Sequence, residues 1–208
     1  DVMMPRMNGY KLCKTIKEDI NISHIPVILL TARDDRQSQI SGYKNGADGY
    51  LSKPFEVEML MELIRNRLKN REYTKKRYLN AGLIPTPEES TISLTDETFL
   101  IKLNSIIQEN IENSNLGIQF ICQEVGLGRS SLYNKLKALT GMGANEYISK
   151  LRIEKAITLI SGTDMPFSEI AEKTGFTTPS YFSTAFKQYT GETPSQYKER
   201  KKKGLADE

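Results

Sequence analysis

The chain has 208 residues, enough for two ordinary domains that each bury a hydrophobic core. With 38% apolar and 26% charged residues, the composition excludes disordered and fibrous classes, and no apolar run approaches the roughly 18 residues of a membrane span. The formal charge of +3 neither establishes nor excludes a nucleic-acid partner, because the position of the cations matters more than their sum. Cys13 and Cys122 lie far apart and are predicted to be free thiols, and the lone His24 is interpreted as structural.

Residues 1–70 alternate between helical and strand-like patterns. Residues 26–32 are a continuous apolar run, typical of a strand buried on both faces of a parallel sheet. Residues 49–55 indicate a second, shorter strand that leads into a turn. Helical periodicity predicts three helices around these strands, over residues 10–19, 37–45 and 56–68. The last of these carries an apolar stripe made of Met59, Leu60, Leu63, Ile64 and Leu68.

Three features in chain order resemble a bacterial response-regulator receiver domain. They are the opening sequence Asp1-Val2-Met3-Met4-Pro5-Arg6-Met7-Asn8-Gly9, the pair Thr31-Ala32 at the end of the first apolar run, and Lys53-Pro54 after the second. In that family the phospho-acceptor Asp ends the third strand of a doubly wound, flavodoxin-like sheet, and ligands bind at the carboxyl ends of the strands. The resemblance therefore implies an α/β receiver remnant, with further strands expected upstream of Asp1.

The resemblance also implies a role for individual residues of this remnant. Asp1 would accept the phosphoryl group, Lys53 would pair with it, and Thr31 would hydrogen-bond a phosphate oxygen. Tyr50 would be the aromatic switch that turns inward when Thr31 moves, and Ala32 would leave room for the phosphate. Lys53-Pro54 would be a cis peptide, which X-Pro bonds allow at low energetic cost.

A magnesium site is implied only in part. The family binds Mg²⁺ with an acidic pair from its first strand, with the acceptor Asp and with a backbone carbonyl two residues on, which here gives Asp1 and Met3. Mg²⁺ demands near-octahedral oxygen ligands, and the acidic pair does not occur in this sequence. We therefore expect Mg²⁺ in the intact receiver, no tight binding by these 208 residues and inefficient phosphorylation of them.

The segment 71–95 is predicted to be a basic helix end followed by a linker. Cations are dense over residues 65–77, where they either complement a helix C-terminus on a solvated face, which we favour, or form a basic tether close to DNA. Residues 80–90 have two prolines and no periodicity. We expect a truncated receiver over 1–70, this segment over 71–95, a helical domain over 96–203 and a tail over 204–208.

A weak internal repeat organises the helical domain. Residues 121–127 match residues 170–176, and each segment reads as a short helix ended by a glycine that can adopt positive φ. Each leads into a second helix, over 129–139 and 179–189. The inward apolar pairs of these second helices are Leu132 with Leu136 and Phe182 with Phe186. The pattern predicts two helix–turn–helix units whose second helices are free to enter a major groove.

Two further helices complete this domain. Thr95 is a candidate N-cap for a helix whose apolar stripe contains Phe99, Leu100, Leu103, Ile106, Ile107 and Ile111. A long helix over 145–161 joins the two units, and at 1.5 Å per residue it is about 24 Å long. It could hold two recognition helices about 34 Å apart, one turn of DNA, so that one chain reads adjacent major grooves.

The helical domain with its two helix–turn–helix units resembles AraC/XylS-type DNA-binding domains, most clearly in the second unit. The residues that carry this resemblance are Ile170-Ala171, Gly175-Phe176, Ser180-Tyr181-Phe182, Phe186-Lys187, Gly191-Glu192-Thr193-Pro194 and Tyr197. Two departures stand out. Gly117 and Gly128 occupy positions where family helices usually carry Ser caps, and Thr184 replaces a frequent Arg, which removes a bidentate guanine contact.

Outward polar side chains of the second helices are the predicted DNA contacts. Asn134 is suited to adenine and Arg129 to guanine or phosphate, whereas Lys137, Arg152 and Lys187 are expected to bind the DNA backbone. The complete predicted set is Arg129, Ser130, Tyr133, Asn134, Lys137, Arg152, Thr178, Ser180, Ser183, Thr184 and Lys187. Each of them alone is also compatible with a plain surface position, and we expect a homodimer to strengthen modest binding by one chain.

Together the resemblances imply a cytoplasmic DNA-binding transcription factor of a two-component phosphorelay. Its sequence-specific binding would be controlled by phosphorylation of Asp1, with a histidine kinase domain as donor. The domain order also resembles the C-terminal end of hybrid histidine kinase/response regulator proteins, whose upstream domains can be anchored in the inner membrane. We favour this parent over a stand-alone AraC-type response regulator.

Other functions fit the sequence less well. No kinase glycine boxes or phospho-acceptor His motif occur, so these residues are not themselves an enzyme. Asp1, Thr31 and Lys53 argue against a ligand-binding AraC regulator without a receiver. Asn134 and Arg129 argue against an interaction module that has lost DNA binding.

Overall fold

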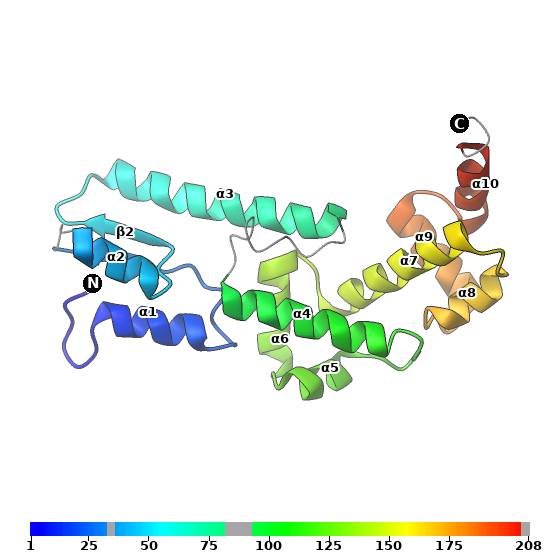
Figure 1. The fold of residues 1–208 in the computed structure, drawn as a ribbon, viewed down its shortest axis with the longest axis horizontal. Coiled ribbons are helices and arrows are strands. Elements are labelled where there is room, and N and C mark those ends of the chain that lie inside the picture. The colour runs from blue at the N-terminus through cyan, green and yellow to red at the C-terminus, as the bar shows by residue number, and fades with distance from the viewer. Residues whose placement is uncertain (33–35, 82–92, 205–208) are drawn as a thin grey trace. The chain divides into compact units, whose positions relative to one another are not determined.

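The computed structural model describes residues 1–32, 36–81 and 93–204 (Figure 1). The fold is mostly helical, with a small sheet of two parallel strands. The chain divides into two compact units, the first made of Asp1–Ile101 with Ser130–Gly141, and the second made of Lys102–Arg129 with Met142–Glu208. Among the described residues we find no helix with the length and hydrophobicity that crossing a bilayer requires.

The sheet of the first unit lies among short helices. Its elements in chain order are α1 (Gly9–Glu18), β1 (Ile28–Thr31), α2 (Arg36–Lys44) and β2 (Gly49–Ser52). The strands pair in parallel from Ile28 opposite Gly49 to Thr31 opposite Ser52, and α2 supplies the crossover that parallel strands need. A small core forms from Val2, Cys13, Leu29, Ala47 and Tyr50. A Cβ at Gly42 would lie 3.0 Å from Tyr50 Cδ2, so this glycine makes room for the tyrosine ring.

The strands are shorter than the predicted ranges 26–32 and 49–55: β1 starts later, where a side chain takes up a backbone N–H, and β2 starts at Gly49 as predicted but ends earlier. The backbone N–H of Val27 donates to the carboxylate of Asp48 at 2.6 Å. Lys17 Nζ donates to the carbonyl of Ile25 at 2.8 Å and forms a 2.7 Å ion pair with Asp48. At the other end, Pro54 has no N–H with which to continue the ladder.

Helix α3 (Val57–Ala81) has 25 residues and continues well beyond the predicted range 56–68. It contains neither Gly nor Pro, and the pairs Glu62–Arg65 and Glu72–Lys75 stabilise it at i,i+3 spacing. The predicted linker 80–90 therefore begins inside α3, and its remaining residues lie outside the described part of the chain. The predicted apolar stripe is only partly covered, since Met59 and Leu68 are more than half exposed.

Two helices of the helical region contribute to the first unit: the start of α4 (Leu94–Glu109), and α6 (Arg129–Thr140). The predicted N-cap of α4 is wrong, because Ser93 Oγ, rather than Thr95, accepts from the backbone N–H of Asp96, at 3.2 Å. Thr95 lies inside the first turn, and its hydroxyl donates to the carbonyl of Lys17 at 3.0 Å. As predicted, Leu132 and Leu136 of α6 are buried.

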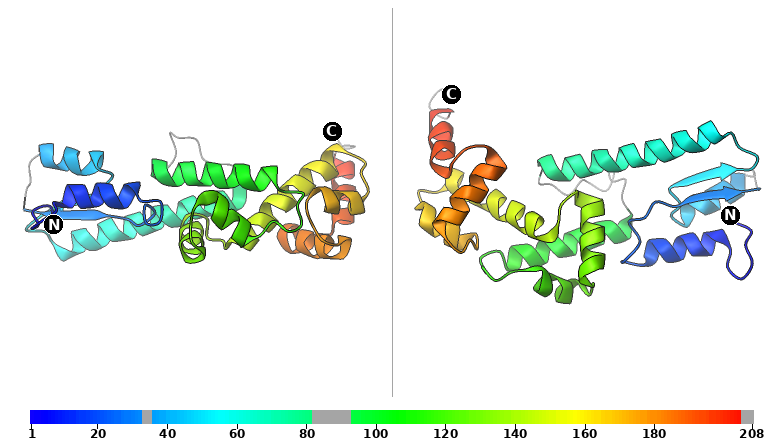
Figure 2. Two further views of the ribbon diagram at one scale, coloured as in Figure 1. Left: turned by 90° about the horizontal axis from the view of Figure 1, so that it is seen from below. Right: turned by 180° about the vertical axis from the view of Figure 1, so that it is seen from behind.

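The second unit gathers around α7 (Ala144–Gly162), with α8 to α10 against its C-terminal part in both views of Figure 2. It also contains the part of α4 from Lys102 on, α5 (Ile118–Val125), α8 (Phe167–Lys173), α9 (Pro179–Thr190) and α10 (Pro194–Gly204). The core contains an aromatic chain from Phe176 through Phe182 and Phe186 to Tyr197, with ring centroids 5.4–5.7 Å apart. Phe182 and Phe186 are completely buried, which confirms their predicted inward position.

Candidate functional site

Asp1 lies at the carboxyl end of the small sheet, with both carboxylate oxygens bonded. Lys53 Nζ lies 3.1 Å from Oδ2, and the backbone N–H of Val2 donates to Oδ1 at 2.8 Å. Gly9 allows the start of α1 to approach Asp1 closely, because a Cβ there would lie 2.3 Å from the Asp1 carbonyl oxygen. The structure thus brings together the predicted phospho-acceptor and the predicted lysine.

The other predicted switch residues lie beside this ion pair along the two strands. The backbone N–H of Lys53 donates to the carbonyl of Thr31 at 2.6 Å, and the predicted cis peptide between Lys53 and Pro54 is present. Thr31 is fully buried and Tyr50 is 9% exposed, within the core of the sheet. A cation and an acidic side chain thus meet at the strand ends, the place where open α/β sheets bind ligands.

The described residues do not fit a magnesium ion. No group of three or more His, Cys, Asp and Glu side chains that could hold a metal occurs among them. The one carboxylate at the predicted place, that of Asp1, already bonds Lys53 and the N–H of Val2. Mg²⁺ requires several oxygen ligands in octahedral geometry, and the carbonyl of Met3 would add only one.

Helix α6 presents a polar face at helical spacing. Ser130, Tyr133, Asn134 and Lys137 occupy positions i, i+3, i+4 and i+7, and all four are exposed. Arg129, also exposed, donates from Nη2 to Gln119 Oε1 at 3.4 Å. These five predicted contacts are therefore accessible to a nucleic acid, with amide, hydroxyl and cationic groups that suit base edges and phosphates.

The corresponding face of α9 carries fewer free polar groups. Thr178 is the N-cap, and its hydroxyl accepts from the N–H of Tyr181 at 3.2 Å. Thr184 Oγ1 donates to the carbonyl of Ser180 at 3.0 Å, within the helix. Ser180 and Lys187 are exposed, and Ser183 is half-buried.

Tyr181 and Gln188 are exposed on the same side of α9 as Thr184, three residues before it and four after it. Neither is among the predicted contacts. The sequence could have indicated both residues as candidates. Their helical spacing from Thr184 places them on its side of α9, whereas Phe182 and Phe186 mark the buried side. An exposed tyrosine, here 52% accessible, offers both a hydroxyl and a flat ring to a nucleic acid.

The prediction that Arg152 binds the DNA backbone is corrected by its burial. Only 8% of Arg152 is exposed, its Nη2 donates to the carbonyl of Asn113 at 2.7 Å, and its guanidinium lies 5.9 Å from the centre of the Phe176 ring. Burial lowers the pKa of this arginine. The sequence held a signal, because the apolar Ile148 and Ala156 precede and follow Arg152 by four residues on one helix face.

Comparison with known families assigns both parts of the chain. A family model for the response regulator receiver domain matches residues 1–65, and one for a helix–turn–helix domain matches residues 121–200. The chain is a response regulator receiver segment joined to an AraC-type helix–turn–helix domain. Both are regulatory domains without an enzymatic activity of their own.

The chain is similar in sequence to a histidine kinase and to response regulators. The chain is 43% identical over 200 residues to histidine kinase P4 of Formosa agariphila, covering 96% of this chain and 14% of that protein. It is 51% identical over 69 residues to the heme response regulator HssR of Staphylococcus saprophyticus, covering 33% of this chain and 30% of that protein. The receiver and AraC-type domain thus span only a small part of the kinase.

Two solved structures are similar to about half of the chain. The C-terminal domain of the response regulator AraT from Geobacillus stearothermophilus is 31% identical, with a TM-score of 0.47 over 49% of this chain and 84% of that one. The C-terminal domain of the response regulator yesN from Fusobacterium nucleatum is 32% identical, with a TM-score of 0.44 over 46% of this chain and 93% of that one.

Proposed function

We propose that this chain is the output end of a two-component phosphorelay, in which phosphorylation of Asp1 in the intact receiver controls sequence-specific DNA binding. The observation that carries the proposal is the exposed polar face of α6 in a chain that also holds a receiver segment. Regulation of transcription is the activity that joins these two domain types.

At the input end, a histidine kinase domain, on the same chain or on another, would donate the phosphoryl group to Asp1. Lys53, whose ammonium lies 3.1 Å from the carboxylate, would pair with the new phosphate oxygens through a charge-assisted hydrogen bond. The hydroxyl of Thr31 would donate to the same group. Mg²⁺ would supply charge neutralisation, with acidic ligands from outside the described residues.

At the output end, α6 would lie in a major groove. Asn134 has the amide that pairs with the adenine edge, and Lys137, three residues further along the same face, would bind a phosphate. The α9 helix would enter a second groove, where the exposed Ser180 would contact base edges and the exposed Lys187 the DNA backbone. A homodimer formed by phosphorylated receivers would raise occupancy of paired sites.

The whole protein is proposed to be a hybrid that carries sensor and kinase domains upstream. The match to the histidine kinase P4 supports this, because it extends over both domains of the chain at 43% identity. A stand-alone AraC-type response regulator is the second candidate, supported by the match of the receiver segment to the regulator HssR. Sequencing the gene upstream of the codon for Asp1 distinguishes the two.

A mobility-shift titration of the 208-residue chain on DNA sites selected from a random pool tests the output function. Asn134→Ala is expected to weaken binding by about 10- to 100-fold, the range for loss of one bidentate base contact. Asn66→Ala, which truncates an exposed asparagine on α3, is the matched control and should leave affinity unchanged. Equal affinities for Asn134→Ala and the control would contradict the role of α6.

A further inference from the structure

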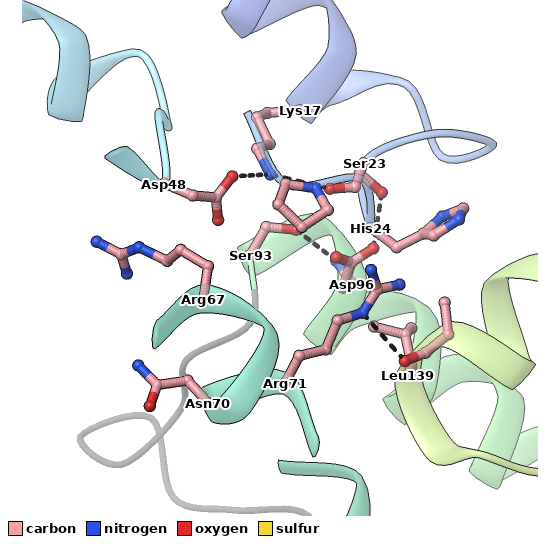
Figure 3. A pocket seen from close by; sticks show the side chains of 12 residues that line it. Lys17, Ser23, His24, Asp48, Arg67, Asn70, Arg71, Ser93, Asp96 and Leu139 are labelled. Atoms are coloured by element: carbon pink, nitrogen blue, oxygen red, sulfur yellow. Dashed lines mark hydrogen bonds and ion pairs between the residues drawn. The ribbon is translucent and has the colours of Figure 1, made fainter. Parts of the chain in front are cut away.

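A charged cluster is buried in the first unit, where the receiver segment meets α4 and α6. Lys135 and Ser23 are fully buried and Asp96 is 3% exposed. Ser23 Oγ donates to Asp96 Oδ1 at 2.7 Å, and Lys135 Nζ donates to Ser23 Oγ at 2.7 Å. Lys135 also forms an ion pair with Asp96. Ser23 and Asp96 line a cavity of about 70 Å³. Figure 3 shows the two side chains joined by their hydrogen bond.

The polar groups of this cluster satisfy one another. A buried ion costs several kcal/mol of desolvation unless it is paired and hydrogen-bonded. The Lys135 ammonium has a carboxylate, a hydroxyl and, 5.1 Å away, the face of the Phe99 ring. The Ser23 hydroxyl acts as donor and acceptor at once. Desolvation lowers the pKa of Lys135, and the hydrogen bond that Lys135 donates to Asp96 opposes that shift.

The three side chains come from distant parts of the chain. Ser23 lies before β1, at the amino end of the strands, whereas Asp1 lies at their carboxyl end. Asp96 is in the first turn of α4, and Lys135 follows Asn134 directly in α6. The buried Lys135 side chain therefore lies on the side of α6 away from the exposed face that carries Asn134, the predicted base contact.

Two more bonds extend this contact on either side. The hydroxyl of Thr95 donates to the carbonyl of Lys17 at 3.0 Å, and Arg71 Nε donates to the carbonyl of Ala138 at 3.4 Å. Lys17 Nζ forms an ion pair with Asp48 Oδ2 at 2.7 Å, which restrains Lys17 on the receiver side of the contact. Helix α4 is therefore bonded to the receiver segment through Thr95 and Asp96, and α6 is bonded to it through Lys135 and to the following part of α3 through Arg71.

The contact leaves the polar face of α6 open, since Tyr133, Asn134 and Lys137 remain exposed. We propose that the amino-end edge of the receiver, centred on Ser23, is the docking surface through which the receiver acts on α6. It holds the helix from behind through Lys135 and Asp96 and so fixes the orientation of the face that carries Asn134. The effect on DNA affinity rests on the proposed function, whereas the docking itself does not.

Swapping the hydroxyl of Ser23 and the carboxylate of Asp96, the two acceptors of Lys135, tests the docking in the 208-residue chain. Ser23→Asp alone places two carboxylates on one ammonium, and Asp96→Ser alone leaves Lys135 without a carboxylate. The double variant Ser23→Asp/Asp96→Ser restores one carboxylate and one hydroxyl, with their origins reversed. Hydrogen–deuterium exchange of the α6 amides should be about tenfold faster in each single variant and return to within about threefold of wild type in the double variant.

Thr15→Asp, the same change at an exposed position of α1, is the control and should leave exchange in α6 unchanged. The docking would be overturned if the increase in α6 exchange in the double variant equalled the product of the increases in the two single variants. Such independence would mean that, in the wild type, Asp96 pairs with Lys135 without help from Ser23 of the receiver. DNA affinity is measured on the same five proteins: wild type, the two single variants, the double variant and Thr15→Asp. It should fall at least about threefold in Ser23→Asp and recover in the double variant.

The two readouts separate the two proposals. Faster exchange in Ser23→Asp with unchanged DNA affinity would overturn the inference that the receiver acts on α6 through this surface. Failure of the wild-type chain to bind any selected DNA would contradict the proposed function, while the exchange data would still decide the docking.

Discussion

Gly175 occupies a position where any side chain would meet two obstacles at once. Its φ is +72°, a left-handed conformation that costs an L-residue roughly 1–2 kcal/mol. A Cβ would also lie 2.2 Å from the Ile111 carbonyl oxygen and 2.8 Å from Arg152 Nη2. Gly175→Ala should therefore push the backbone away from Ile111 and displace the guanidinium that bonds the carbonyl of Asn113.

The repeat in the sequence offers a matched control for this change. Gly126 has the same φ of +72°, but a Cβ there would meet nothing within 4 Å. Gly126→Ala should cost only the conformational penalty of about 1–2 kcal/mol. Gly175→Ala adds an overpacking cost of about 1–3 kcal/mol and weakens a charged hydrogen bond, so its total should be larger by at least about 2 kcal/mol.

Urea denaturation of the two variants, followed by circular dichroism, measures this difference directly. The larger loss should appear as a lower midpoint for Gly175→Ala without a change in slope for either variant. Equal midpoints for the two alanine variants would refute the close approach of Gly175 to Ile111 and Arg152.

Three further predictions concern side chains whose environment the structure defines. Arg152→Ala should lower the free energy of unfolding by about 2–4 kcal/mol, because packing and a charged hydrogen bond are lost together; weaker DNA binding at unchanged stability in urea would contradict its burial. Burial, and next the charge of Lys135, lower the pKa of His24 below the value of about 6.5 that it has in the unfolded chain. Folding then releases a proton, so stability should fall as the pH drops below about 6.5, and His24→Gln should reduce the loss in unfolding free energy measured between pH 7.5 and 5.5. An identical loss in both proteins would exclude His24 as its source. Lys53→Met should change the unfolding free energy by less than about 1 kcal/mol, because both partners of the pair with Asp1 are partly exposed. A loss above about 2 kcal/mol in the same assay would assign Lys53 a structural role instead.

Local patterns predicted the elements that depend on near neighbours in sequence. Helix α1 begins and ends within one residue of the predicted 10–19, because Asn8 caps it by accepting from the N–H of Lys11. The inward positions of Phe182 and Phe186 follow from their four-residue spacing. The pairing of Asp1 with Lys53 was predictable only from resemblance to a family, since 52 residues separate them.

The partners of charged residues that the fold buries could not be predicted in the same way. Lys135 lies between the exposed Asn134 and the buried Leu136, and its burial depends on Ser23, 112 residues earlier. Arg152 depends on a carbonyl 39 residues earlier. A cation is buried only where partners from distant segments satisfy it, and helical periodicity does not specify those partners.

The two helix–turn–helix units of one chain are proposed to read DNA separately. Site selection from random DNA with the 208-residue chain tests this claim directly, with wild type and Asn134→Ala in parallel. Wild type should enrich two half-sites about 10 base pairs apart, and the variant should lose base preference in one of them while the other stays intact. Enrichment of no sequence by the wild type, or loss of preference in both half-sites or in neither, would contradict the claim.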